Sequence, residues 1–368
     1  MKVDIRILAL VCVMLGGMGQ GVVSPRLPAL LHESNQIAFD AGASAALMYL
    51  GIFISTFFFG KWADRGWVNR IMGFGLSAYS LILAGFIFAA SVFSIFTLRF
   101  IEGVALSAIY VSADFILGRA SEPKQRGKWL SFYGIALSIG LGLGPVMNLL
   151  NSDQAAPVFS LCMVAALALL LGWVMGFRII PAVSDELSSE PFQYSFPALL
   201  SGASYGFIEA GLVAVLPVVA LQQFHYSPEK GLIVVIISAA LFSLLWGELS
   251  TRIRNRTIVQ FLFLMLAVGC LALFFKSQII LSCILFGAVA GGLYPIGFAW
   301  LLEGLPEAAF GKASGAFSRA YGLGSLGGPL TLGFLAERYS QNGLYAGLSA
   351  IGALAFLVIT FTKPKKNS

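Results

Sequence analysis

The chain has 368 residues, of which 58% are hydrophobic and only 11% are charged, against about 25% charged in an ordinary soluble domain. A soluble globule of this size cannot cover so much apolar surface, so the composition excludes a soluble enzyme or binding domain and predicts a protein embedded in lipid. The net charge of +6 does not indicate nucleic-acid binding, because the basic residues lie in short stretches between long apolar runs.

Apolar runs long enough to cross a membrane recur along the whole chain. A helix needs about 20 apolar residues to span about 30 Å of hydrocarbon, and continuous runs favour helices over the alternating strands of a barrel. The first run ends in prolines without a small-residue cleavage site, which favours a retained span over a signal peptide. The predicted spans are residues 5–30, 41–59, 71–92, 94–118, 129–150, 156–177, 196–222, 231–247, 258–274, 278–301, 313–335 and 342–362.

The longest polar stretch divides these twelve spans into two equal sets. We therefore predict an all-α integral membrane protein with an N-terminal six-helix bundle over 1–177, a cytoplasmic linker over 178–195 and a C-terminal six-helix bundle over 196–368. Most of the 23 Lys and Arg residues fall on one side of the predicted spans. By the positive-inside rule we expect both termini in the cytoplasm and the chain in the inner membrane of a bacterium.

Short motifs in the loops and spans resemble those of the major facilitator superfamily. The loop 60–70 is similar to its cytoplasmic loop motif, 98–103 to its fourth-span Arg and Gly motif, and 140–145 to its fifth-span Gly-Pro motif. Residues 292–329 resemble the YcaD-like branch of that superfamily. The resemblance implies two pseudo-symmetric bundles with a solute site between them near the bilayer midplane.

The resemblance also implies a cytoplasmic latch. It would consist of Gly60, Asp64 and Arg65 in the loop after the second span and Asp114 near the end of the fourth. Such a charge network holds two halves together in one state and shifts the conformational equilibrium by its differential energy. The alternative is a solvated turn whose basic residues simply obey the positive-inside rule.

Ionisable side chains inside predicted spans are functional candidates, because burying a charge in hydrocarbon is costly, and Glu209, Arg99 and Glu102 are the ones we assign to proton coupling. Glu209, in the middle of span seven, has no possible partner nearby in sequence, and we hypothesise that it carries a proton. The alternative is a permanently protonated, hydrogen-bonded structural residue. Arg99 and Glu102 are spaced to pair on one helix face. Their alternatives are a structural ion pair or an arginine that extends toward the headgroups.

With Gln20 and Tyr294, these residues form the predicted proton-coupling and solute cavity. We expect a secondary transporter that moves a small amphipathic organic solute by alternating access, coupled to protons and favouring export, with uptake left open. We expect a monomer with no enzymatic activity, cofactor, metal site or nucleic-acid partner. The alternative function is a membrane-embedded enzyme or sensor acting on lipid-like molecules.

Overall fold

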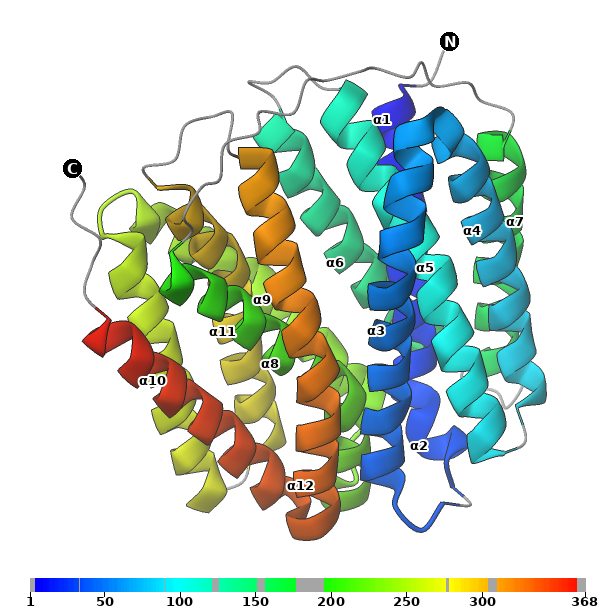
Figure 1. The fold of residues 1–368 in the computed structure, drawn as a ribbon. Coiled ribbons are helices and arrows are strands. Elements are labelled where there is room, and N and C mark those ends of the chain that lie inside the picture. The colour runs from blue at the N-terminus through cyan, green and yellow to red at the C-terminus, as the bar shows by residue number, and fades with distance from the viewer. Residues whose placement is uncertain are drawn as a thin grey trace. The chain divides into compact units, whose positions relative to one another are not determined.

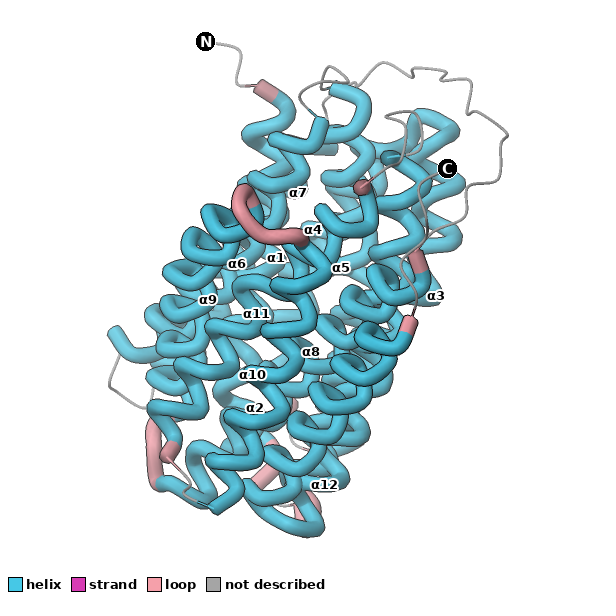
Figure 2. The backbone as a smooth tube through the Cα atoms, turned by 90° about the vertical axis from the view of Figure 1, so that its left-hand side faces the viewer, coloured by secondary structure: helices cyan, strands magenta, loops and turns pink. Residues whose placement is uncertain are grey.

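In a computed structural model of the protein, described for residues 4–32, 34–89, 91–120, 126–150, 156–176, 195–275, 278–303 and 310–362, the chain is helical and these residues form no strand (Figures 1 and 2). The predicted all-α class is confirmed. The elements in chain order are α1 (Ile5–Val23), η1 (Ser24–Arg26), α2 (Leu27–Leu30), α3 (Ile37–Trp62), η2 (Ala63–Trp67), α4 (Val68–Gly85), η3 (Phe86–Phe88), α5 (Val92–Ala120), α6 (Arg126–Leu150), α7 (Ala156–Gly176), α8 (Phe196–Phe224), α9 (Pro228–Ser250), α10 (Asn255–Phe275), α11 (Ile279–Leu302) and α12 (Phe310–Phe361).

The predicted spans coincide with helical segments, although span 5–30 comprises α1, η1 and α2, and span 71–92 comprises α4 and η3 and reaches the first residue of α5. Within the described residues, ten helices are long and apolar enough to cross a membrane, and α7 contains a shorter apolar stretch, Leu161–Leu171. The last two predicted spans both belong to α12, where Ser340 has non-helical angles (φ 55°, ψ −144°). The chain changes direction at that residue, between the orange and red parts of Figure 1. The predicted break between spans eleven and twelve is therefore a single strained residue, with no loop.

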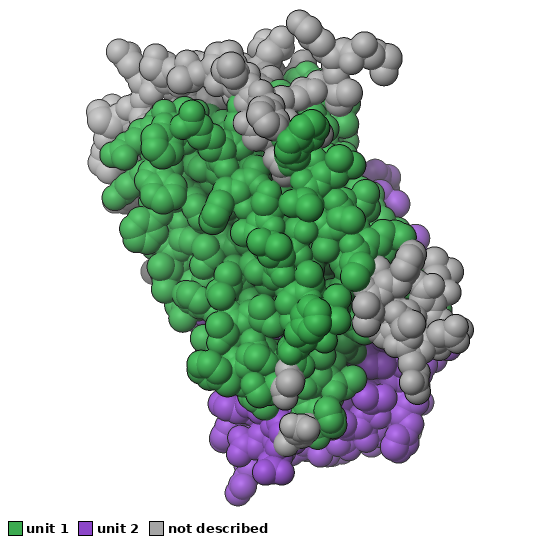
Figure 3. Space-filling view, turned by 90° about the vertical axis from the view of Figure 1, so that its right-hand side faces the viewer, with its two compact units in different colours: residues 1–33, 47–185 green, residues 34–46, 186–368 purple. Residues whose placement is uncertain are grey.

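The chain divides into two compact units, coloured separately in Figure 3: residues 1–33 and 47–185, and residues 34–46 and 186–368. Helix α3 contributes to both, because its first residues belong to the second unit and the rest to the first. The expected linker 178–195 lies, apart from Ser195, outside the described residues. The sequence-based boundaries at 177 and 196 stay a prediction.

In the first unit, α1 packs along α6, and α4 packs against α5 and α7. Glycines bring these backbones together: a Cβ at Gly17 would lie 2.7 Å from the carbonyl oxygen of Leu137, and one at Gly140 would overlap that of Met14. Since lipid supplies no hydrophobic drive between helices, such close backbone contact is what holds a membrane bundle together. In η2, Gly66 has φ 84°, a left-handed conformation that favours glycine.

In the second unit, α8 packs along α12 and α9 along α11. The α8 and α12 backbones approach closely, because Cβ atoms at Gly206, Gly324 and Gly328 would overlap carbonyl oxygens of the facing helix. Gly287 and Gly291 of α11 have the same relation to α9. The glycine abundance of the sequence is thus used for helix–helix approach in both units.

The packing predicts different outcomes for two Gly→Ala substitutions. In Gly324→Ala the new methyl group meets the Ala203 carbonyl, so we expect stability to fall by about 1–3 kcal/mol, as in other overpacked cores. Gly247→Ala on α9 is the matched control, because nothing beyond its own helix backbone lies within 4 Å of its Cβ position among the described residues. It should leave stability unchanged or raise it through helix propensity. Thermal unfolding in detergent measures both, and equal midpoints would contradict the packing argument.

Candidate functional site

Glu209 lies in the middle of α8, half-buried within the second unit. The hydroxyl of Tyr321, on α12, donates a hydrogen bond of 2.7 Å to its Oε2. Close approach of α8 and α12 positions this pair. A Cβ at Gly206 of α8 would overlap the backbone carbonyl oxygen of Tyr321. Among the residues that the structure describes, Glu209 has no ion-pair partner, and its carboxyl group is hydrogen-bonded by the Tyr321 phenol.

Tyr321, the partner of this carboxyl group, belongs to a group of packed aromatic rings that we call the tyrosine cluster: Tyr205, Tyr294, Phe317 and Tyr321. Tyr205, one helical turn before Glu209, stacks on Tyr321 with ring centroids 5.7 Å apart. Tyr294 of α11 lies 5.2 Å from Tyr205 and 6.3 Å from Tyr321, centroid to centroid, and also packs edge-on against Phe317. Tyr294 is 39% exposed. The cluster therefore offers an aromatic face beside an acidic group.

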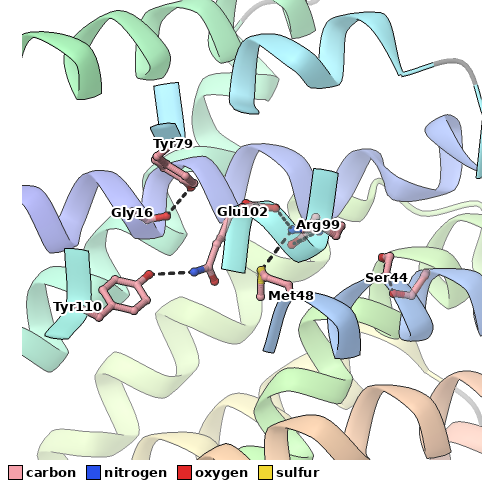
Figure 4. Close-up of polar contacts among 10 residues, drawn as sticks. Gly16, Ser44, Met48, Tyr79, Arg99, Glu102 and Tyr110 are labelled. Atoms are coloured by element: carbon pink, nitrogen blue, oxygen red, sulfur yellow. Dashed lines mark hydrogen bonds and ion pairs between the residues drawn. The ribbon is translucent and has the colours of Figure 1, made fainter. Parts of the chain in front are cut away.

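The first unit contains a buried ion pair on α5. Arg99 Nη1 lies 2.9 Å from Glu102 Oε2, and the two residues are 1% and 0% exposed (Figure 4). The guanidinium also approaches Met48 Sδ at 3.6 Å and Ser24 Oγ at 3.5 Å, with the Phe86 ring 5.9 Å away. The expected pairing is present. Because the arginine is enclosed by protein, extension toward the headgroups is excluded.

Two further polar contacts lie in the same unit. The Gln20 side chain, 7% exposed, donates to the Tyr110 hydroxyl at 2.8 Å. The Tyr79 hydroxyl donates to the carbonyl of Gly16 at 2.8 Å (Figure 4). Arg99 Nε and Glu102 Oε1 make no hydrogen bond to the described residues although both are buried. The mostly apolar interior of this unit therefore contains a few polar contacts and one ion pair whose charges neutralise each other.

The residues of the expected latch lie at the ends of their helices. Gly60 is near the end of α3, and Arg65 is exposed in η2. Asp64 belongs to η2, but its side chain is outside the described part of the structure. Asp114 is exposed in α5. No contact between these groups is described, and the latch stays a prediction.

The predicted cavity residues therefore fall into two sets. Arg99, Glu102 and Gln20 belong to the first unit, and Glu209 and Tyr294 belong to the second. Sequence reasoning did not identify Tyr321, which is 112 residues away from Glu209. A tyrosine in a glycine-rich span was the only sequence signal for it, and such a signal does not name a partner.

The buried ion pair predicts a non-additive effect on stability. Arg99→Met leaves the Glu102 carboxylate without its partner in a buried position, so we expect a loss of about 3–5 kcal/mol. The double variant Arg99→Met/Glu102→Met removes both charges and should recover most of that loss. Thermal unfolding of the purified variants tests this. A double variant as unstable as the single one would show that the pair does not carry the effect.

Comparison with known proteins identifies the fold. The family model described as Major Facilitator Superfamily matches residues 9–197 and 198–368. The chain is 24% identical to the uncharacterized MFS-type transporter YfkF of Bacillus subtilis, over 97% of this chain and 95% of that protein. It is 22% identical to the uncharacterized MFS-type transporter YcaD of Salmonella enteritidis, over 92% and 90% of the two chains.

Solved transporters share the architecture at low sequence identity. A bacterial homolog of the human lysosomal transporter Spinster, in an inward-facing and occupied conformation, matches with a TM-score of 0.78 and 13% identity over 98% of this chain and 97% of that one. The xylose transporter XylE of E. coli, inward open, matches with a TM-score of 0.73 and 17% identity over 99% and 97%. With residues 9–368 matched by the family model, this multi-pass membrane protein belongs to the Major Facilitator Superfamily of secondary transporters, and within it resembles the YcaD-like proteins.

Proposed function

We propose that this protein moves a small amphipathic organic solute by alternating access, in exchange for protons carried by Glu209. The observation that supports the proposal best is the half-buried Glu209 carboxyl group, hydrogen-bonded by Tyr321 and bordered by the tyrosine cluster. An ionised carboxylate at this depth is costly unless a cation or water meets it. A proton satisfies that requirement in one state and can leave in the other.

The surroundings of Glu209 also restrict the charge of the solute. The aromatic rings of Tyr205 and Tyr294 suit an apolar or aromatic body, and ring faces attract cations. The described residues around Glu209 provide no basic side chain to bind an anion. The site therefore favours a neutral or cationic solute over an anionic one.

Direction, topology and assembly are parts of the same proposal. Pro145 inside α6, close after Gly140 and Gly144, corresponds to the span-five motif that favours export. The distribution of Lys and Arg supports cytoplasmic termini in a bacterial inner membrane. One chain supplies both family repeats, which supports a functional monomer.

An enzyme or sensor for lipid-like molecules is the alternative function. Saturable solute flux that responds to a pH gradient would distinguish a carrier from both.

Glu209→Gln tests the proton-carrying role. In liposomes with an imposed pH gradient, the variant should lose gradient-driven transport but keep solute exchange and binding, because the amide preserves the shape of the site and cannot release a proton. Glu248→Gln is the control, since this carboxylate is exposed at the end of α9 and pairs with Arg252 of the same helix end. Unchanged gradient-driven flux in Glu209→Gln would remove this residue from the mechanism.

The charge preference predicts different behaviour for two ions of the same shape, tetraphenylphosphonium and tetraphenylborate. The cation should raise the unfolding temperature of the purified protein more than the anion, because a ligand at a hundredfold excess over Kd stabilises the folded state by about 2.7 kcal/mol. Glu209→Gln should narrow the difference. Equal stabilisation by both ions, unaffected by the substitution, would contradict the preference while leaving proton coupling open.

A further inference from the structure

The connection between α3 and α4 carries basic and aromatic side chains on its outer surface. Lys61 lies near the end of α3, Arg65 in η2 and Arg70 in the first turn of α4, and all three are exposed. Trp62 and Trp67 beside them are exposed as well. We call these five residues the basic–aromatic turn. Indole rings left exposed among cations are typical of a membrane–water interface, where one part of the ring is in lipid and the other is hydrated.

Exposed phenylalanines lie one helical turn away from the basic residues, toward the middle of each helix. Phe57 precedes Lys61 by four residues and Phe74 follows Arg70 by four, so each ring shares a helix face with a cation. Both phenylalanines are more than half exposed. Four residues rise about 6 Å along a helix, which places an apolar surface directly beside each charge. This order of charge and apolar surface matches the headgroup and acyl chains of a phospholipid.

The basic side chains of this turn keep their charge available. Within the described part of the chain, Lys61, Arg65 and Arg70 make no contact with a carboxylate. Arg70 instead packs over the ring of Trp67, 5.7 Å from its centroid. A ring face holds a guanidinium in place without neutralising it. Asp64 is the one acidic residue in this stretch of sequence, so three basic residues leave an excess of positive charge.

The corresponding turn of the second unit uses its basic residues internally. It connects α9 to α10 and contains three arginines but no tryptophan. Arg252 Nη2 lies 2.8 Å from Glu248 Oε1. Arg256 Nη2 donates to the backbone carbonyl oxygens of Ile359 and Thr362, both at 2.6 Å, and so caps the end of α12. The positive-inside rule alone would treat both turns alike, so the difference between them points to a ligand at the first.

We propose that the basic–aromatic turn binds an anionic phospholipid of the surrounding leaflet. The lipid phosphate lies among the three basic side chains, where a guanidinium donates two parallel hydrogen bonds to it. Trp67 holds Arg70 in position, and an acyl chain runs along the exposed phenylalanines. An anionic headgroup is preferred to a choline headgroup, because it has no ammonium group for these cations to repel. The site requires neither solute nor proton, so it is independent of the proposed transport function.

Native mass spectrometry of the delipidated protein can measure this site. The protein is titrated with phosphatidylglycerol or with phosphatidylcholine of the same acyl chains, and the wild type should bind phosphatidylglycerol more tightly. Lys61→Gln/Arg70→Gln should weaken that binding about ten- to thirtyfold, the effect of two basic residues near a membrane surface, with little change for phosphatidylcholine. Trp67→Leu should weaken it about two- to fivefold, because Arg70 loses the ring that orients it.

Arg252→Gln/Arg254→Gln is the matched control, because it removes the same charge from exposed residues of the turn that lacks tryptophan. It should change the affinity for phosphatidylglycerol less than twofold. An equal loss in this control would overturn the proposal, since the preference would then reflect overall charge. Equal binding of the two lipids by the wild type would also overturn it. So would a Lys61→Gln/Arg70→Gln variant that binds phosphatidylglycerol as the wild type does.

Discussion

Close contact between helix backbones is the constraint on which the other features of this protein depend. In hydrocarbon, apolar side chains gain nothing by leaving lipid for a neighbouring helix, so the helices must meet through small residues. Where α8 meets α12, Gly206 and Gly324 remove the side chains that would keep them apart. The short distance that results is what allows the hydroxyl of Tyr321 to reach Glu209. The same geometry at Gly42 brings α3 within reach of Glu337.

The two units handle buried charge in different ways. In the first, Arg99 and Glu102 neutralise each other, and an ion pair with both members enclosed does not need an ion from outside. In the second, Glu209 has only a phenol as its described polar partner, and a phenol donates a hydrogen bond without supplying charge. The charge state of Glu209 therefore depends on which proton, cation or water reaches its carboxyl group. This difference assigns the proposed proton exchange to Glu209 and a supporting role to the ion pair.

The sequence was sufficient for features that follow from local spacing. Continuous apolar runs predicted the helices, and the three-residue spacing of Arg99 and Glu102 predicted their pairing, because both depend on helix geometry alone. The Tyr321–Glu209 bond could not be predicted, since it depends on which helices become neighbours and on their rotation. The division of α3 between units had no sequence signal either. A periodic apolar pattern shows that a helix exists but does not name what it packs against.

Helix α3 is longer than the hydrocarbon core requires. Its 26 residues, at 1.5 Å per residue, give a rod of about 39 Å, against a hydrocarbon core of about 30 Å. Glu337 of α12 accepts hydrogen bonds from its first turn, and the helix ends at the η2 turn, where Gly66 takes the left-handed conformation. The apolar run predicts that such a helix spans the membrane, because length and hydropathy are local properties. The acceptor for its first N–H groups could not be predicted, since it comes from a position 299 residues away.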